Sequence, residues 1–202
     1  MRLNKKDYTA NSSDVGFDFV PVQLLEQGKP TWVHPAEDDV DAAVLPVSPD
    51  LHQKFDVVTI PVDLFPTDAE LAAQSIGDPI MSAGLLPALP GIKRNYPVFK
   101  FGQISNVPAE DIETRCAPQQ QTFFVRVWLI AANLIPGNSG SPIFHVPLGG
   151  MLLGVQSISV TGADIAGMTP INFVYDLLLK IGFPDADLHR GPSIPQTTPE
   201  PK

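Results

Sequence analysis

The sequence predicts an all-β protein, and three observations support that prediction. Short apolar runs rich in Val, Ile and Phe recur from Phe17 to Ser159 and are separated by Pro, Gly, Asn and Asp, as in a β-sandwich or β-barrel. Proline makes up 22 of the 202 residues, which is about twice its usual share, so long uninterrupted helices are not expected. Apolar residues make up 44% and charged residues 17%, a balance typical of a chain with a sizeable core.

The strand candidates follow one another along the chain. Several are apolar at consecutive positions, as expected when both faces of a strand are buried in a closed core. In order, they are Phe17–Leu25, Ala42–Val47, Phe55–Pro61, Pro97–Ile104, Gln121–Ile130, Pro142–Val146 and Met151–Val160.

Two segments predict helix. Thr67–Ser75 begins with a residue type that caps helices and continues with Ala-Glu-Leu-Ala-Ala. Ile171–Ile181 has apolar residues at helical spacing, and Gly182 follows as the expected C-terminal cap. We expect this second helix to pack on the domain and close it.

Charge and cysteine content exclude several classes of protein. The chain carries 13 basic and 22 acidic residues, a net charge of −9, which argues against nucleic acid or an anionic membrane surface as a partner. The single cysteine, Cys116, excludes an intrachain disulfide and a cysteine-rich zinc site. No signal peptide or transmembrane segment is predicted. We expect a soluble protein, cytoplasmic as written, or secreted if an upstream segment is missing.

The segment Pro136–Phe144 is where chemistry is expected. It reads Pro-Gly-Asn-Ser-Gly-Ser-Pro-Ile-Phe between two strand candidates. A nucleophilic serine must project its hydroxyl from a tight turn while backbone N–H groups converge on the developing oxyanion, and small neighbours allow both. The lipase-type Gly-x-Ser-x-Gly elbow is not matched, because the fifth residue is Ser141.

This segment resembles a known family. Gly137–Pro142 is similar to the active-serine motif of trypsin-like serine peptidases, and Asp41–Leu45 resembles the strand that carries their aspartate. Asp41 precedes Ser139 by about 98 residues, close to the roughly 93 of the family's triad. Leu152–Ser157 resembles the strand after the active serine, and Gly167–Pro170 resembles the strand before the closing helix.

The resemblance implies a fold of two antiparallel β-barrels, the first of them incomplete, followed by a C-terminal helix. The peptidase domain would cover residues 1–190, with the first barrel at about 1–85 and the second barrel and helix at about 86–190. The proline-rich segment 191–202 is expected to be a disordered tail, because it has only one large apolar residue.

The resemblance also implies roles for individual residues. Ser139 would be the nucleophile and Asp41 would orient a histidine, while the N–H groups of Gly137 and Ser139 would form the oxyanion hole. No cofactor or metal is implied, and the partner would be a polypeptide substrate or peptide ligand. The substrate-binding residues would be Asn133, Ser157 and Ser159.

The catalytic histidine is missing from this pattern. The family places it roughly 45 residues before the aspartate, which falls upstream of Met1. His34 is the nearest substitute, His52 carries no signal, and His145 and His189 are expected at the surface. Either the true start lies upstream, or the first barrel is truncated and the protein is a pseudoenzyme. We therefore expect a serine endopeptidase acting through Ser139 that is inactive as written, or an inactive protease-like module that binds peptides or protein partners.

Overall fold

The computed structural model describes residues 1–9, 11, 13–85, 91–114, 122–134, 137–146, 150–159 and 164–184. Three features singled out in the sequence lie outside these residues: Cys116, His189 and the proline-rich segment 191–202.

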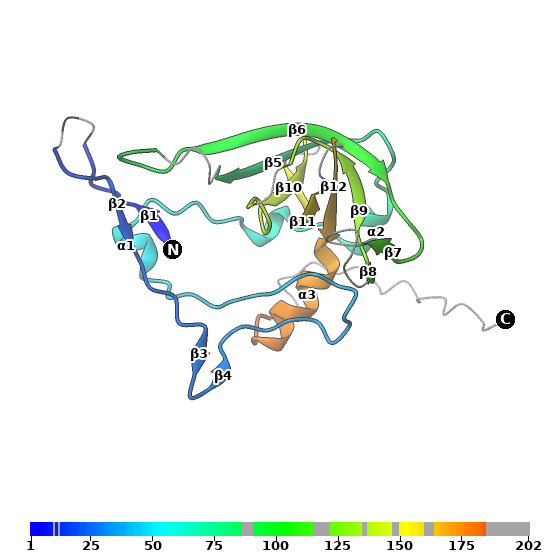
Figure 1. Ribbon diagram of the computed structural model, residues 1–202, viewed down its shortest axis with the longest axis horizontal. Coiled ribbons are helices and arrows are strands. Elements are labelled where there is room, and N and C mark those ends of the chain that lie inside the picture. Colours follow the sequence, from blue (N-terminus) through cyan, green and yellow to red (C-terminus); the bar gives the residue numbers. More distant parts are fainter. Residues whose placement is uncertain are drawn as a thin grey trace.

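A closed barrel of six antiparallel strands dominates the described structure (Figure 1). Its strand order is β10-β11-β12-β9-β6-β5, and every neighbouring pair is antiparallel. The all-β prediction is confirmed in this form. The strands are β5 (Pro79–Leu85), β6 (Pro97–Asn106), β9 (Trp128–Ala131), β10 (Pro142–His145), β11 (Met151–Ser159) and β12 (Ile165–Pro170).

Aliphatic side chains from all six strands fill the barrel. Each strand contributes at least one side chain with no more than 1% of its surface exposed. Burying such a side chain stabilises the fold by about 1.5–3 kcal/mol, so these six residues form the centre of the core. These residues are Ile80, Ile104, Ile130, Ile143, Leu153 and Met168.

Both predicted helices are present. The short helix α2 (Asp68–Ala72) begins at Thr67 with a capping box, in which Glu70 N–H donates to Thr67 Oγ1 and Glu70 Oε2 accepts from Thr67 N–H. The last helix, α3 (Ile171–Lys180), is followed by Gly182 at φ +87°. It packs against β11 and β12, and the buried Tyr175 hydroxyl donates to the carbonyl of Pro66. No helix among the described residues is long and apolar enough to cross a membrane.

The predicted first barrel is not formed in the described residues, where only one barrel occurs. Ala42–Val47 and Phe55–Pro61 were expected as strands, but each contributes only one isolated bridge, Val44 to Val33 and Phe55 to Lys5. Prolines recur through 20–61, and a residue without an N–H cannot donate to a central ladder. The remaining elements are β1 (Arg2–Asn4), β2 (Phe17–Phe19), β3 (Leu25–Glu26), β4 (Lys29–Pro30), α1 (Leu51–Lys54), a 3₁₀ turn (Val62–Leu64), β7 (Ile112–Thr114) and β8 (Phe123–Val125).

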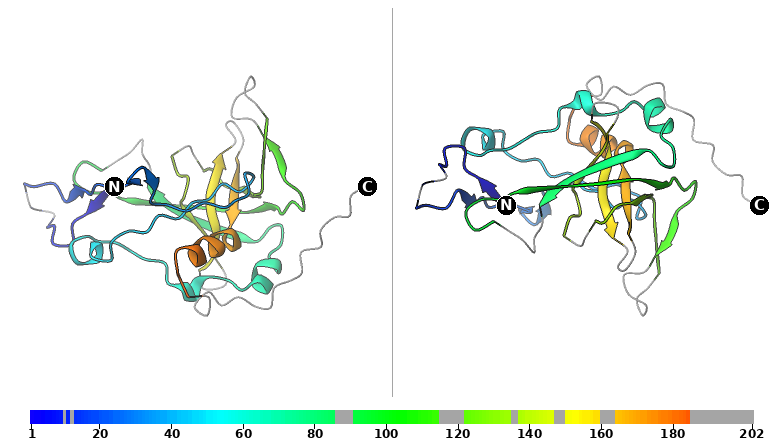
Figure 2. Two further views of the ribbon diagram at one scale, coloured as in Figure 1. Left: turned by 90° about the horizontal axis from the view of Figure 1, so that it is seen from below. Right: turned by 90° about the horizontal axis from the view of Figure 1, so that it is seen from above.

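The β1-β2 sheet lies beyond one end of the barrel, as both views in Figure 2 show, whereas β3 and β4 lie nearer to α3 in Figure 1. These strands form two-stranded sheets, β1-β2 and β3-β4. The chain just before β6 fastens the first sheet, because Asn95 N–H donates to Asn4 Oδ1 at 2.7 Å and Asn95 Nδ2 donates to the carbonyl of Arg2 at 2.8 Å. The boundary expected near residue 85 falls between β5 and β6, and both are strands of the one barrel.

Candidate functional site

Ser139 lies at the tip of a turn at the start of β10. Gly137 has φ +92° and Gly140 has φ +83°, values that favour glycine on either side of the serine. The Ser139 side chain is exposed, and its Oγ lies 3.4 Å from the carbonyl oxygen of Ser157 on β11. The turn therefore presents the hydroxyl to solvent beside β11.

Two backbone hydrogen bonds fix this turn to β11. Gly140 N–H donates to the carbonyl of Gln156 at 2.8 Å, and Gln156 N–H donates to the carbonyl of Ser141 at 2.9 Å. They continue the β10-β11 ladder, in which Pro142 pairs with Val155. The position of Ser139 thus follows from the barrel.

The side chain of Asn138 joins the turn to β5 and β6. Only 5% of its surface is exposed. Its Nδ2 donates to the carbonyl of Leu85 at the end of β5 (2.7 Å), and its Oδ1 accepts from Lys100 Nζ on β6 (3.1 Å). Gly84 leaves room for this arrangement, because a Cβ there would approach the Ser141 hydroxyl and lie 3.0 Å from Asn138 Nδ2.

Lys100 was not among the predicted site residues. It lies within the strand predicted at 97–104. Lys100 and Ile104 are four residues apart and therefore face the same side of this strand, and Ile104 is buried. A lysine on the inward side of a strand is unusual, and that position was the available signal. Burial lowers the pKa of Lys100, because removing an ammonium group from water disfavours its charged form.

Asp41 lies against the outside of the barrel at β12. The buried Thr169 hydroxyl donates to the main-chain carbonyl of Asp41 at 2.9 Å, while the side chain of Asp41 is exposed. Thr169 pairs with Val155, two residues before Ser157. Two residues along a strand span about 7 Å, so Asp41 and Ser139 both contact the same stretch of the β11-β12 ladder.

Arg126 holds the chain that leads into Asp41. Its backbone N–H donates to the carbonyl of Asp39 at 2.7 Å, and its guanidinium pairs with the carboxylates of Asp39 (2.5 Å) and Asp111 (3.0 Å). The hydrogen bond to Asp111 is the main cause of the raised pKa of Arg126. The described residues contain no group of three or more side chains that would hold a metal ion.

Of the remaining predicted residues, Ser157 and Ser159 lie on β11 and Asn133 follows β9. The Ser157 hydroxyl lies 3.4 Å from the carbonyl oxygen of Gly167, and the Ser159 hydroxyl accepts from Gln156 Nε2 at 3.0 Å. Both serines are half-buried. Asn133 is exposed just beyond the end of β9.

The predicted oxyanion hole consists of two amide groups in this turn. Among the described residues, no backbone carbonyl accepts a hydrogen bond from the N–H of Gly137 or Ser139. Their neighbours Gly140 and Ser141 both donate within the described structure, to Gln156 and Asn138 respectively. Among the described residues, the amides of Gly137 and Ser139 therefore have no backbone acceptor, whereas those of Gly140 and Ser141 each have one.

The three described histidines lie elsewhere. Within the described part of the chain, no hydrogen bond joins a histidine side chain to Ser139. The His34 ring lies 5.3 Å from the Trp32 ring at a tilt of 46°, and the His34 carbonyl lies 3.5 Å from Lys180 Nζ at the end of α3. His52 is exposed in α1.

His145 was expected at the surface, and that prediction is wrong. It is only 7% exposed, and no described residue contacts its Nδ1 by a hydrogen bond. It alternates with the buried Ile143 along β10, and this periodicity turns it inward. It lies three residues along β10 from Pro142, about 10 Å from the end that carries the serine turn.

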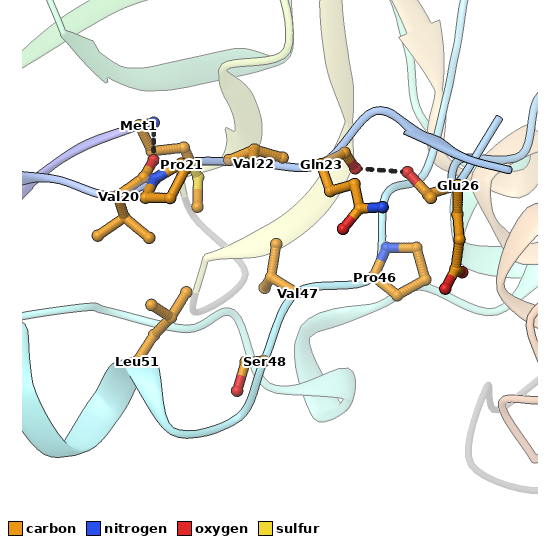
Figure 3. A pocket seen from close by; sticks show the side chains of 11 residues that line it. Met1, Val20, Pro21, Val22, Gln23, Glu26, Pro46, Val47, Ser48 and Leu51 are labelled. Carbon is orange, nitrogen blue, oxygen red and sulfur yellow. Dashed lines mark hydrogen bonds between the residues drawn. The ribbon is translucent and has the colours of Figure 1, made fainter. Parts of the chain in front are cut away.

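A groove of about 270 Å³, which was not predicted from the sequence, lies in the N-terminal part (Figure 3). Segments 20–31 and 46–51 form its walls, with Met1 at one end. Figure 3 shows Val20, Val47 and Leu51 around it. None of the predicted site residues lines this groove.

Comparison with known proteins does not place the chain in a family. No protein-family model matches the sequence, and the search of curated proteins gives no match. The function of the site is therefore argued from its geometry.

Proposed function

We propose that the protein is a serine endopeptidase of the trypsin-like type, with Ser139 as nucleophile. The observation that carries this proposal is the turn itself: an exposed serine between two glycines of positive φ, fastened to β11 on one side and to β5 and β6 through Asn138 on the other. The likeness of Gly137–Pro142 to the trypsin-like motif supports the same assignment.

The proposed chemistry is acyl transfer. Ser139 Oγ attacks the carbonyl carbon of the scissile peptide, its proton passes to a base, and the resulting oxyanion accepts hydrogen bonds from the amides of Gly137 and Ser139. The base returns the proton to the leaving amine as the peptide bond breaks. Water then hydrolyses the acyl-enzyme and regenerates Ser139.

Within the described part of the chain, no hydrogen bond joins Ser139 to a side chain that could act as the general base. Without it, a triad enzyme keeps only the contribution of substrate binding and the oxyanion hole. The described chain by itself is therefore expected to turn over very slowly. An added small base that fits the same space should restore part of the rate.

Imidazole tests this proposal directly. The folded protein is incubated with an activated ester and with a fluorophosphonate probe, each with and without imidazole. Imidazole should accelerate both reactions in the unaltered chain, and Ser139→Ala should abolish that acceleration. Ser75→Ala, at an exposed serine outside the barrel strands, serves as the matched control and should react as the unaltered chain does.

A second function is favoured by the histidine positions. Since no hydrogen bond joins a described histidine to Ser139, the same turn and the adjoining β11 edge of the site also fit an inactive module that binds peptides without cutting them. Peptide binding measured by fluorescence polarisation, with no cleavage and no Ser139-dependent labelling in imidazole, would support this function and refute the peptidase.

A further inference from the structure

Lys100 occupies an unusual place in the barrel. Its side chain is half-buried and belongs to the alternating set on β6 that includes the fully buried Ile104. Its cross-strand partner on β5 is Ser82, which is also buried. Taking an ammonium group out of water costs stability unless a polar partner compensates, so a residue here is better explained by a contact it makes than by packing.

That contact is with the serine turn. Lys100 Nζ donates to Asn138 Oδ1 at 3.1 Å, and Asn138 is the residue immediately before Ser139. The other end of the same amide donates to the carbonyl of Leu85 at 2.7 Å. With both ends held, the amide plane cannot rotate without breaking one of the two hydrogen bonds.

The surrounding residues are small, as this arrangement requires. A Cβ at Gly84 would approach the Ser141 hydroxyl and Asn138 Nδ2. The absence of a side chain at Gly84 therefore leaves room for Asn138 and Ser141 beside β5. Asn138 is bonded to β5 and β6, whereas Ser139 Oγ lies beside β11, so Lys100 acts on the turn and not on the hydroxyl.

We propose that Lys100 is a positioning residue for the nucleophile turn, acting through Asn138. This inference rests on the proposed function for its consequence, the reactivity of Ser139. Its structural content, that the lysine orders the turn, is independent of catalysis. A charge-assisted hydrogen bond from Lys100 holds the side-chain amide of Asn138, the residue directly before Ser139.

Hydrogen exchange of residues 137–141 tests the structural content. We compare the unaltered chain with Lys100→Gln, which keeps a neutral donor, and Lys100→Met, which keeps the length and removes the donor. Exchange of the Gly140 and Ser141 amides should rise about tenfold in Lys100→Met and by less in Lys100→Gln. Lys29→Met, on the exposed strand β4, is the matched control and should leave these amides unchanged.

The outcomes separate the two proposals. Exchange in Lys100→Met within about twofold of the unaltered chain, in protein whose circular dichroism shows a folded barrel, overturns the positioning role. If Lys100→Met does not fold, the same criterion applies to Lys100→Ala, which also removes the donor. If exchange rises but imidazole induces no Ser139-dependent labelling of the unaltered chain, the peptidase proposal fails while the positioning role stands. If labelling occurs, its rate should fall about tenfold in Lys100→Met.

Discussion

Replacing Asn138 by alanine tests how firmly the barrel holds the serine turn. The substitution removes a side chain that is 5% exposed and takes part in two hydrogen bonds. The carbonyl of Leu85 loses its donor and Lys100 loses its acceptor. The backbone of the turn keeps its own bonds to β11.

The magnitude follows from the two bonds. A neutral bond such as that to Leu85 contributes about 1 kcal/mol, and a bond from a charged donor such as Lys100 contributes about 2 kcal/mol. Lys100 is only half-buried, so its ammonium group partly regains water and the second value is an upper one. We expect Asn138→Ala to lower the free energy of unfolding by about 2–3 kcal/mol, or Tm by about 5–10 °C in a chain of this size.

Urea denaturation followed by circular dichroism measures this change, and calorimetry checks Tm. Asn133→Ala is the matched control, because Asn133 is exposed in a neighbouring loop and should change the unfolding free energy by no more than about 0.5 kcal/mol. If Asn138→Ala costs no more than Asn133→Ala, the buried amide does not anchor the turn and the reasoning is wrong.

Three further predictions concern other parts of the chain. Thr67→Ala removes the Thr67 side chain from the α2 capping box and should lower the free energy of unfolding, measured by urea denaturation, by about 1 kcal/mol. An unchanged free energy would show that the cap does not stabilise the protein. Arg126→Met should cost about 1 kcal/mol, since Arg126 is 43% exposed, and should speed thermolysin cleavage within 37–44, whereas an unchanged rate would show that Asp39 is not held by Arg126. The pKa of Lys100 is lowered by burial from 10.5, so the unfolded state binds more protons than the folded state as pH rises toward that value. The unfolding free energy of the unaltered chain should therefore rise relative to that of Lys100→Met between neutral pH and pH 10, and a falling difference would contradict this sign.

Local pattern was enough to predict several elements. The runs that became β6, β10 and β11 are apolar stretches bounded by turn residues, and the helix at Ile171 has a clear helical period. The serine turn was equally visible, because positive-φ glycines and a small, polar sequence are properties of the segment itself. These features depend on neighbours a few residues apart, and a sequence shows them directly.

Strand pairing was less predictable. Ala42–Val47 has the composition of a strand, yet within the described residues it forms only the isolated bridge from Val44 to Val33. The segment at 79–85, which reads as little more than a turn-flanked run, became β5 with partners on both sides. The two segments differ because only 79–85 meets distant segments whose N–H and C=O groups are free to pair with it. The composition of a segment does not show this.

The sequence by itself determined the all-β class, the closing helix and a glycine-flanked serine at a strand end. Only the tertiary structure decided that one barrel closes, that His145 is turned inward, and that Asn138 joins Leu85 and Lys100 beneath Ser139. The physical reason is range: backbone freedom and periodicity act over a few residues, whereas Lys100 and Asn138 meet across 38 positions because barrel closure brings β6 and β10 to opposite sides of β5.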